Sequence, residues 1–173
     1  MKSEELLETF DLNGNFLGLI SRKDCHKNPG IAHRAVHLLV FKNEKELFLQ
    51  KRSEKKDLYP LCWDTSVGGH LNVGESYIDA AIRECIEELG FKPLTVKFLY
   101  KYTAFFEEET ELVETFATFY NKEFNINKEE VAEVKVFSLD YLFNLNDHSF
   151  FSPYFILELG HLKCHIKSGG SLK

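Results

Sequence analysis

The sequence predicts a domain of the α/β class, of the α+β kind, in which strands and a few helices form a sandwich. Strand signals come in pairs joined by polar turns, and helical periodicity is confined to one central and one C-terminal segment. The chain has 173 residues, 44% of them apolar and 28% charged, which is enough to bury a core. No repeat or Pro/Gly/Ser linker divides it, so residues 1–173 are expected to form a single domain.

The strand signals follow one another along the chain. Residues 5–10 and 16–21 flank the dipeptide Asn13-Gly14, which favours a hairpin. Single strands are expected at 35–41, 46–51, 65–69 and 131–137. A second hairpin is expected at 94–106 and 112–120, around an acidic turn at 107–111. We interpret that turn as a solvated tip, with a carboxylate that reaches a metal as the alternative.

The central helix is expected at residues 76–89. Ser76 can cap its start and Gly90 can supply the left-handed residue at its end. Four residues at helical spacing define the face expected to contact the core: Ile78, Ile82, Cys85 and Leu89.

The C-terminal helix is expected at residues 153–166. Its apolar residues, with those just before it, predict packing on the domain core and, in part, a homodimer contact: Phe150, Phe151, Tyr154, Phe155, Ile156 and Leu159. Packing within the chain alone is the alternative.

Composition narrows the class of protein. A net charge of −6 argues against a protein that coats a nucleic acid polymer. The first residues, Met1–Glu5, contain no apolar stretch, and no run is long enough to span a membrane, so no signal peptide and no membrane partner are expected. The four cysteines form no CxxC pair, which favours reduced thiols and a cytoplasmic location.

One segment carries the chemistry. Gly69 is followed after five residues by Glu75, then after seven by Arg83-Glu84, then by Glu87-Glu88 and Gly90. On a helix, the carboxylates of Glu84, Glu87 and Glu88 share a face and repel one another. A hard cation such as Mg²⁺ or Mn²⁺ reverses that repulsion, because it takes oxygen ligands and bridges them to phosphates. A solvated acidic face is the alternative interpretation.

This segment is identified as the Nudix box, and the chain resembles Nudix hydrolases. The resemblance implies a Nudix fold, with a mixed β-sheet sandwiched between helices and a catalytic loop–helix–loop. It implies Mg²⁺ (or Mn²⁺) held by Glu84, Glu87 and Glu88, to which the Gly69 carbonyl can add a ligand. Glu75 would support the helix and Arg83 would steer Glu84 or Glu87. One of the box carboxylates, with Glu87 and Glu84 as candidates, or a carboxylate outside the box, would be the general base.

The resemblance extends to the isopentenyl-diphosphate isomerase-like branch of this superfamily, through segments 33–37, 49–53, 56–60 and 63–70. Isomerases of this branch hold a metal with three histidines and two glutamates. The three histidine positions match His26, His33 and His70, and the position of the catalytic glutamate matches Glu114. Leu112 stands where the second glutamate is expected, and Gly68 stands where these isomerases have a cysteine. Both departures count against isomerisation.

Other residues match the substrate-binding parts of this branch. Arg52 and Lys56 match positions that hold the diphosphate, with solvated cations as the alternative. Trp63 can stack on a substrate, as can Tyr59, Phe105 and Phe106, although packing is their ordinary role.

The histidines divide by their places in the chain. His26 lies in a predicted loop, where a surface position is expected. His33 and His37 share one side of a strand and can line a pocket or be structural. His70 adjoins the box and is the best pocket candidate.

We therefore predict a metal-dependent hydrolase that cleaves a diphosphate linkage in a nucleoside diphosphate derivative or a related small organic diphosphate. The alternatives are an isopentenyl-diphosphate isomerase-like enzyme and a non-catalytic ligand-binding module. The leaving moiety stays open, because the loops that read it follow no general code.

Overall fold

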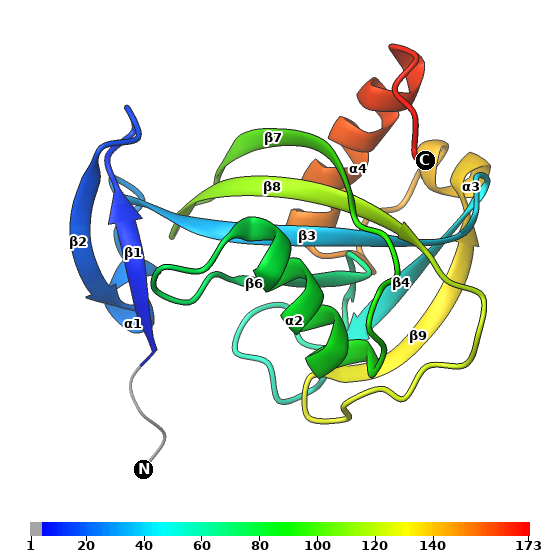
Figure 1. Cartoon of the computed structure of the whole chain (residues 1–173), viewed down its shortest axis with the longest axis horizontal. Coiled ribbons are helices and arrows are strands. Elements are labelled where there is room, and N and C mark those ends of the chain that lie inside the picture. The colour runs from blue at the N-terminus through cyan, green and yellow to red at the C-terminus, as the bar shows by residue number, and fades with distance from the viewer. Residues whose placement is uncertain (1–4) are drawn as a thin grey trace.

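A computed structural model describes residues 5–173 (Figure 1). The prediction that there is no signal peptide was based on residues 1–5 and therefore falls largely outside the described residues. The elements are β1 (Leu6–Phe10), β2 (Phe16–Ser21), α1 (Arg22–Cys25), β3 (Ala32–Asn43), β4 (Glu46–Arg52), β5 (Trp63–Asp64), β6 (Val67–His70), α2 (Tyr77–Leu89), β7 (Lys97–Phe105), β8 (Thr110–Phe119), β9 (Val131–Ser138), α3 (Leu139–Phe143) and α4 (Pro153–Lys167). Across the described part of the chain, no helix combines the length and apolar content needed to cross a membrane.

The long strand β3 organises the sheet. One edge pairs in parallel with β8, from Ala32 opposite Thr110 to Phe41 opposite Phe119. Along the other edge β3 pairs antiparallel with β1, β6 and β4 in turn. The strand β4 then continues to β5 and β9. The sheet is therefore mixed, as the sequence predicted, and β6 lies in line with β4 rather than beside it.

Helices cover both faces of this sheet. Side chains of β3 alternate, so that Leu39 and Phe41 pack toward α4 while Val36, Leu38 and Val40 pack toward α2. Figure 1 shows α2 in front of the sheet and α4 behind it. Burying each such side chain stabilises the fold by roughly 1.5–3 kcal/mol. The predicted sandwich of a sheet between helices is confirmed.

The helix α2 has the ends that the sequence predicted. The Ser76 hydroxyl accepts a hydrogen bond from the backbone N–H of Asp79, and Gly90 has φ 73°. The predicted core face is wrong in part, because Ile78 is 43% exposed. The buried residues are Ala80, Ala81, Cys85, Leu89 and the acidic Glu88. The small side chains of Ala80 and Ala81 let α2 lie close to the sheet, and Glu88 lies on the same buried face of the helix.

The hairpin of β7 and β8 has a shorter turn than the sequence predicted. Glu107 and Glu108 are exposed, but Glu109 is buried and Glu111 already belongs to β8. The expected solvated tip is therefore limited to its first residues.

The apolar C-terminal segment packs largely within the chain. Phe151, Phe155 and Leu159 belong to the core beside α4, whereas Phe150 is 67% exposed. Neither α1 nor α3 was predicted, because both are single short turns without periodicity.

Candidate active site

A cavity of about 540 Å³ is lined by residues of β4, β5 and β6. The box residues line it from α2 and β6, and other polar residues line it from β4, β5, β8 and the loops. These linings include Gly69, His70, Arg83, Glu84, Glu87 and Glu88, with Gln50, Arg52, Lys56, Asp64, His26, His37, Glu109 and Glu111. Because β6 is short and has Gly68 and Gly69 at its centre, groups from both faces of the sheet reach the same space.

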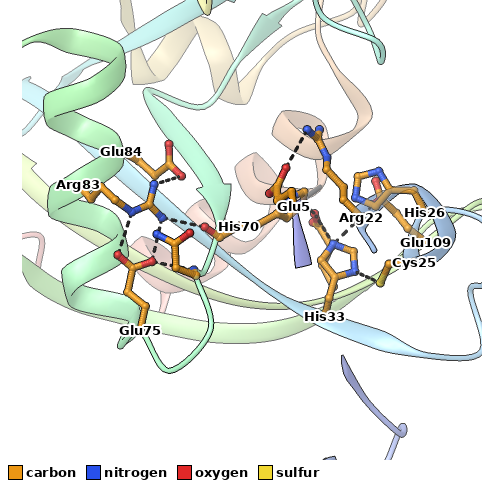
Figure 2. Close-up of polar contacts among 12 residues, drawn as sticks. Glu5, Arg22, Cys25, His26, His33, His70, Glu75, Arg83, Glu84 and Glu109 are labelled. Atoms are coloured by element: carbon orange, nitrogen blue, oxygen red, sulfur yellow. Dashed lines mark hydrogen bonds and ion pairs between the residues drawn. The ribbon is translucent and has the colours of Figure 1, made fainter. Parts of the chain in front are cut away.

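Arg83 links the box residues to one another (Figure 2). Its Nη1 donates to Glu84 Oε1 at 2.7 Å and to Glu87 Oε2 at 3.2 Å. Its Nε and Nη2 donate to the Glu75 carboxylate at 2.8 and 2.9 Å, and Nη2 also donates to the carbonyl of His70 at 3.0 Å. A planar guanidinium with five donors can hold several acceptors in fixed places. The structure thus puts Arg83 in position to steer both Glu84 and Glu87.

One of the box carboxylates, Glu88, is buried, and a second, Glu84, is half-buried. Glu88 is 3% exposed and accepts hydrogen bonds from Gln50 Nε2 at 2.8 Å and the backbone N–H of Gly68 at 3.4 Å. Burial raises the pKa of Glu88 to about 8, with the charge of Glu84 adding to the effect. Burial also raises the pKa of Glu84 to about 7, although Arg83 opposes the shift. Neighbouring carboxylates of this kind are stabilised by a cation.

Gly69 makes room for this arrangement. A Cβ atom at this position would overlap the Glu84 carboxylate, so any other residue would push Glu84 aside. The Gly69 backbone and the Glu84 carboxylate therefore share the wall of the cavity. An oxygen-rich set built from Glu84, Glu87, Glu88 and a nearby carbonyl matches the ligands that Mg²⁺ and Mn²⁺ prefer, and the box residues fit such an ion.

A second group of metal-ligating side chains adjoins the box. One ligand atom from each of His26, His33, His70 and Glu109 lies within 4.8 Å of the others. His26 Nε2 is 3.1 Å from Glu109 Oε2, and His33 Nε2 is 3.7 Å from carboxylate oxygens of both Glu109 and Glu111. We define the histidine cluster as His26, His33, His70, Glu109 and Glu111. Within it, His70 lies between Arg83 on one side and His26 and His33 on the other (Figure 2).

The atoms that converge in the histidine cluster lack hydrogen bonds. Among the described residues, His26 Nε2, His33 Nε2 and Glu109 Oε2 are buried without a hydrogen-bond partner. The far ring nitrogens are occupied: His33 Nδ1 is 3.2 Å from Cys25 Sγ, and His70 Nδ1 is 3.3 Å from Glu5 Oε1. Histidines that ligate metals are commonly oriented through the other ring nitrogen in this way. The residues of the cluster therefore fit a metal ion.

The charges of the cluster act on its histidines in opposite directions. Burial, with the neighbouring rings of His70 and His33, lowers the pKa of His26 to about 3. Burial also disfavours the charged form of His33, but its contacts with Cys25 and Glu111 outweigh burial and raise the pKa of His33 to about 10, so a metal ion would have to displace the His33 proton. Three imidazoles this close resist being protonated together, and a neutral imidazole is the form that binds a metal.

The glutamates of the histidine cluster correct the sequence assignment. Glu111 lies opposite His33 in the parallel pairing of β3 and β8, on the face toward α4. Leu112 and Glu114 lie opposite Arg34 and Val36, and Val36 packs toward α2. Glu114 does not line the cavity. Glu109 and Glu111, three residues before Leu112 and Glu114, therefore supply two carboxylates beside the histidines, where the sequence analysis expected one.

The predicted substrate-binding residues separate into two groups. Arg52 and Lys56 line the cavity, and Arg52 is fixed by Asp64 Oδ2 at 2.8 Å and the carbonyl of Leu58 at 3.0 Å. Trp63 does not line it. Its ring packs edge-on against Phe137, 5.1 Å away, so its role is in the core.

Sequence reasoning also misplaced His26, whose side chain is only 15% exposed. It follows the single turn of α1, which returns the chain to the sheet. The spacing Glu109-Thr110-Glu111, with two acids two residues apart on one side of a strand, was the available signal for the second pair of carboxylates.

This fold and this cavity define a Nudix-type domain. The model of the NUDIX domain matches residues 31–159, and the chain belongs to the Nudix family. Proteins of this family are generally pyrophosphohydrolases that use divalent metal ions.

Three relatives illustrate the range of the family. The chain is 37% identical over 101 residues to an uncharacterised Nudix hydrolase of Streptomyces coelicolor, covering 58% of this chain and 55% of that protein. It thus spans about half the length of that relative. It is 32% identical over 133 residues to an uncharacterised Nudix hydrolase of Listeria innocua, covering 75% and 77%. It is 35% identical over 136 residues to isopentenyl-diphosphate Delta-isomerase 2 of Photorhabdus laumondii, covering 76% of each.

Solved structures share the fold. A protein of Deinococcus radiodurans superposes with a TM-score of 0.68 and 21% identity, covering 98% of this chain and 93% of that one. The NUDIX domain of Shewanella oneidensis NrtR, solved with ADP-ribose, superposes with a TM-score of 0.61 and 13% identity, covering 77% and 87%.

Proposed function

We propose that this protein is a metal-dependent hydrolase that cleaves the diphosphate linkage of a nucleoside diphosphate derivative or a related organic diphosphate. The observation that carries the proposal is that Glu84, Glu87 and Glu88 line one cavity, where Glu88 is buried and Arg83 forms ion pairs with Glu84 and Glu87. Like charges at this spacing destabilise a helix. A divalent cation bound by these carboxylates would offset their repulsion.

In this proposal Glu84, Glu87, Glu88 and the Gly69 carbonyl hold Mg²⁺ (or Mn²⁺). When bound, such an ion neutralises phosphate charge and lowers the pKa of a coordinated water. Glu87 has a side chain that is 55% exposed, the most open of the three, so it can accept the proton of the attacking water. Arg83 positions Glu84 and Glu87, and Glu75 anchors Arg83 from behind.

The phosphate oxygens are held from the opposite wall. Arg52 keeps donors free beyond those given to Asp64 and Leu58, and Lys56 adds a charge beside Glu84 and Glu88. Guanidinium and ammonium groups are common ligands of phosphate.

A substrate screen tests this function. Nucleotide sugars, dinucleotides, coenzyme A derivatives and isoprenoid diphosphates would each be incubated with the protein and Mg²⁺, Mn²⁺ or EDTA. We expect mass spectrometry to detect cleavage at the diphosphate of at least one compound, only with the metal. Binding of a compound without turnover under every condition would instead support a non-catalytic module.

A second candidate is the isomerisation of an isoprenoid diphosphate. The histidine cluster favours it, because the two glutamates that the sequence had placed elsewhere accompany the three histidines. Gly68 counts against it, because a glycine has no group to move a proton where the isomerases of this branch have a cysteine. We expect no allylic isomer from labelled isopentenyl diphosphate. Its formation at enzyme-like rates would favour the isomerase over the hydrolase.

A further inference from the structure

A buried hydrogen-bond network lies behind the cavity, between β3 and α4. His37 Nδ1 is 2.7 Å from Glu158 Oε2, and Glu158 is fully buried. The same carboxylate accepts hydrogen bonds from the hydroxyls of Tyr102 at 2.8 Å and Thr115 at 2.9 Å, and from Tyr100. The box and the histidine cluster make no use of this network.

These contacts fix the state of the His37 ring. A carboxylate that accepts from three hydroxyls acts as an ionised acceptor, so His37 Nδ1 must donate its proton to it. Burial lowers the pKa of His37, but the hydrogen bond and charge of Glu158 outweigh burial and raise it above its ordinary value. The ring is therefore oriented from behind, and the raised pKa favours its charged form, in which Nε2 also carries a proton to donate.

The Nε2 atom faces the cavity. His37 lines the cavity, and within residues 5–173 no protein group forms a hydrogen bond with Nε2. Gly68 lies opposite His37 in the pairing of β3 and β6. A Cβ atom at Gly68 would be 3.3 Å from His37 Cδ2, 3.7 Å from Nε2 and 3.2 Å from Thr65 Oγ1. The glycine therefore leaves open the space beside the ring that any side chain would fill.

His37 differs from the other basic groups of the cavity. Arg22, Arg52, Lys56 and Arg83 are each paired with a carboxylate of Glu5, Asp64, Glu130 or Glu84, and all four carboxylates also line the cavity. The partner of His37, Glu158, lies outside the cavity in the core. A donor that is anchored from behind keeps its front free for a ligand, and it is already oriented before the ligand binds.

We propose that His37 binds a non-bridging oxygen of the substrate's diphosphate through Nε2–H, in the space that Gly68 leaves open. This inference rests on the proposed function, since it assigns part of the same substrate. His37 is then a binding residue, Glu158 is the residue that positions it, and Gly68 is a determinant of specificity. Gly68 stands where the isomerases of this branch have a cysteine. In this proposal, the lack of a side chain at Gly68 gives the phosphate access to His37.

The direct test follows the ring nitrogens of histidine by NMR. Protein labelled with ¹⁵N at its seven histidines would be titrated with inorganic pyrophosphate in the presence of Mg²⁺, and the His37 signals assigned by their loss in His37→Asn. We expect Nε2 of His37 to shift with pyrophosphate, while the signals of His161, which stacks on Tyr102 outside the cavity, stay in place. Unmoved His37 signals at saturating pyrophosphate would overturn the proposal.

Substitutions give an independent measure. His37→Asn keeps an amide donor at the Nδ1 position for Glu158 but has nothing at the position of Nε2, whereas His37→Gln extends an amide toward it. By calorimetry we expect His37→Asn to weaken pyrophosphate binding by about 10-fold or more, His37→Gln to recover part of the loss, and the control His161→Asn to bind normally. Wild-type affinity in a folded His37→Asn would contradict the proposal.

Gly68→Ala tests the open space while keeping the His37 ring. Its methyl group would crowd the space beside Nε2, so we expect several-fold weaker binding. The double variant with His37→Asn should bind no more weakly than His37→Asn alone, because both remove the same contact. Additive losses would show that the two residues act separately and would count against the pairing.

These outcomes are separable from those of the proposed function. A raised KM with little change in kcat in His37→Asn supports the contact on a hydrolase that works. An unchanged KM in His37→Asn, with hydrolysis by the wild type intact, rejects the contact alone. Shifts at His37 in a protein that hydrolyses nothing support the contact and reject the hydrolase.

Discussion

The box carboxylates and all of the histidine cluster except His33 line the same cavity, but the two groups are assembled differently. Glu84, Glu87 and Glu88 stand on one helix, next to the loop that begins at Gly69, and Arg83 holds two of them. The histidine cluster draws its residues from the end of α1 and from β3, β6 and the β7–β8 hairpin. Local spacing is thus enough to build the first group, whereas the second depends on strand register.

The two groups also differ in chemistry. The box offers only oxygen ligands and suits a hard ion such as Mg²⁺. The histidine cluster offers three imidazoles with carboxylates, a set that suits transition metals. From these different preferences we predict that metal binding has two separable components.

The largest expected effect comes from the box. Glu87→Gln removes one charge at a partly exposed position, so the fold should remain while kcat falls by roughly two to four orders of magnitude. The matched control is Glu108→Gln, an exposed carboxylate on the β7–β8 turn, which should turn over normally. Steady-state kinetics on any substrate found in the screen measure both. Near-normal kcat in Glu87→Gln would separate the box from catalysis.

The histidine cluster is expected to bind a transition metal without Mg²⁺. Zn²⁺ at about 100 times its dissociation constant should stabilise the wild type by about 2.7 kcal/mol. His26→Gln should lose most of the resulting increase in Tm, because His26 contributes one of the converging nitrogens. The exposed His148→Gln is the control. An equal increase in Tm in all three proteins would place the metal elsewhere.

The effect of pH distinguishes the box from the cluster. Burial raises the pKa of Glu84 to about 7 and of Glu88 to about 8, above the ordinary 4.5, so metal-free protein holds most of these protons at pH 6, and by pH 8 it has lost most of the Glu84 proton and about half of the Glu88 proton. Stability from these groups is therefore present below pH 4.5 and lost as pH rises through this window. Mg²⁺ needs the charged forms.

We thus expect a fixed Mg²⁺ concentration to raise Tm more at pH 8 than at pH 6, because protons compete with the ion below the pKa of about 8 of Glu88. Differential scanning calorimetry measures the effect. Glu88→Gln should remove most of the difference between the two pH values. A Mg²⁺ effect that is equal at both pH values in the wild type would show that these carboxylates are not its ligands.

The smallest effect is expected at the start of α2. Ser76→Ala removes the hydroxyl that accepts from Asp79 and should cost about 1 kcal/mol, a decrease in Tm of roughly 2–4 °C for a chain of this size. The kcat should stay near the wild-type value, because packing of Ala80, Ala81 and Cys85 holds the helix in place. A large loss of kcat would show that the box needs its cap for alignment.

These differences explain which features the sequence could predict. The box, the caps of α2 and the strand pairs rest on local spacing, and the structure has them where the sequence places them. Glu114 was assigned in place of Glu111 because the start of β8 sets which side chains face His33, and the length of the acidic turn did not reveal it. His37 and Glu158 lie far apart in the chain, so only the packing of α4 on β3 brings them together.

Hydrolysis in ¹⁸O-labelled water tests most directly whether the box promotes attack of water on a diphosphate. The wild type and Glu87→Gln would be incubated with a turned-over substrate from the screen and Mg²⁺, and the products analysed by mass. We predict that one ¹⁸O atom enters a phosphoryl product, that EDTA stops its formation, and that Glu87→Gln slows it by roughly two to four orders of magnitude. Unlabelled product, or the same labelled product at the same rate with EDTA, would contradict a metal-dependent diphosphate hydrolase.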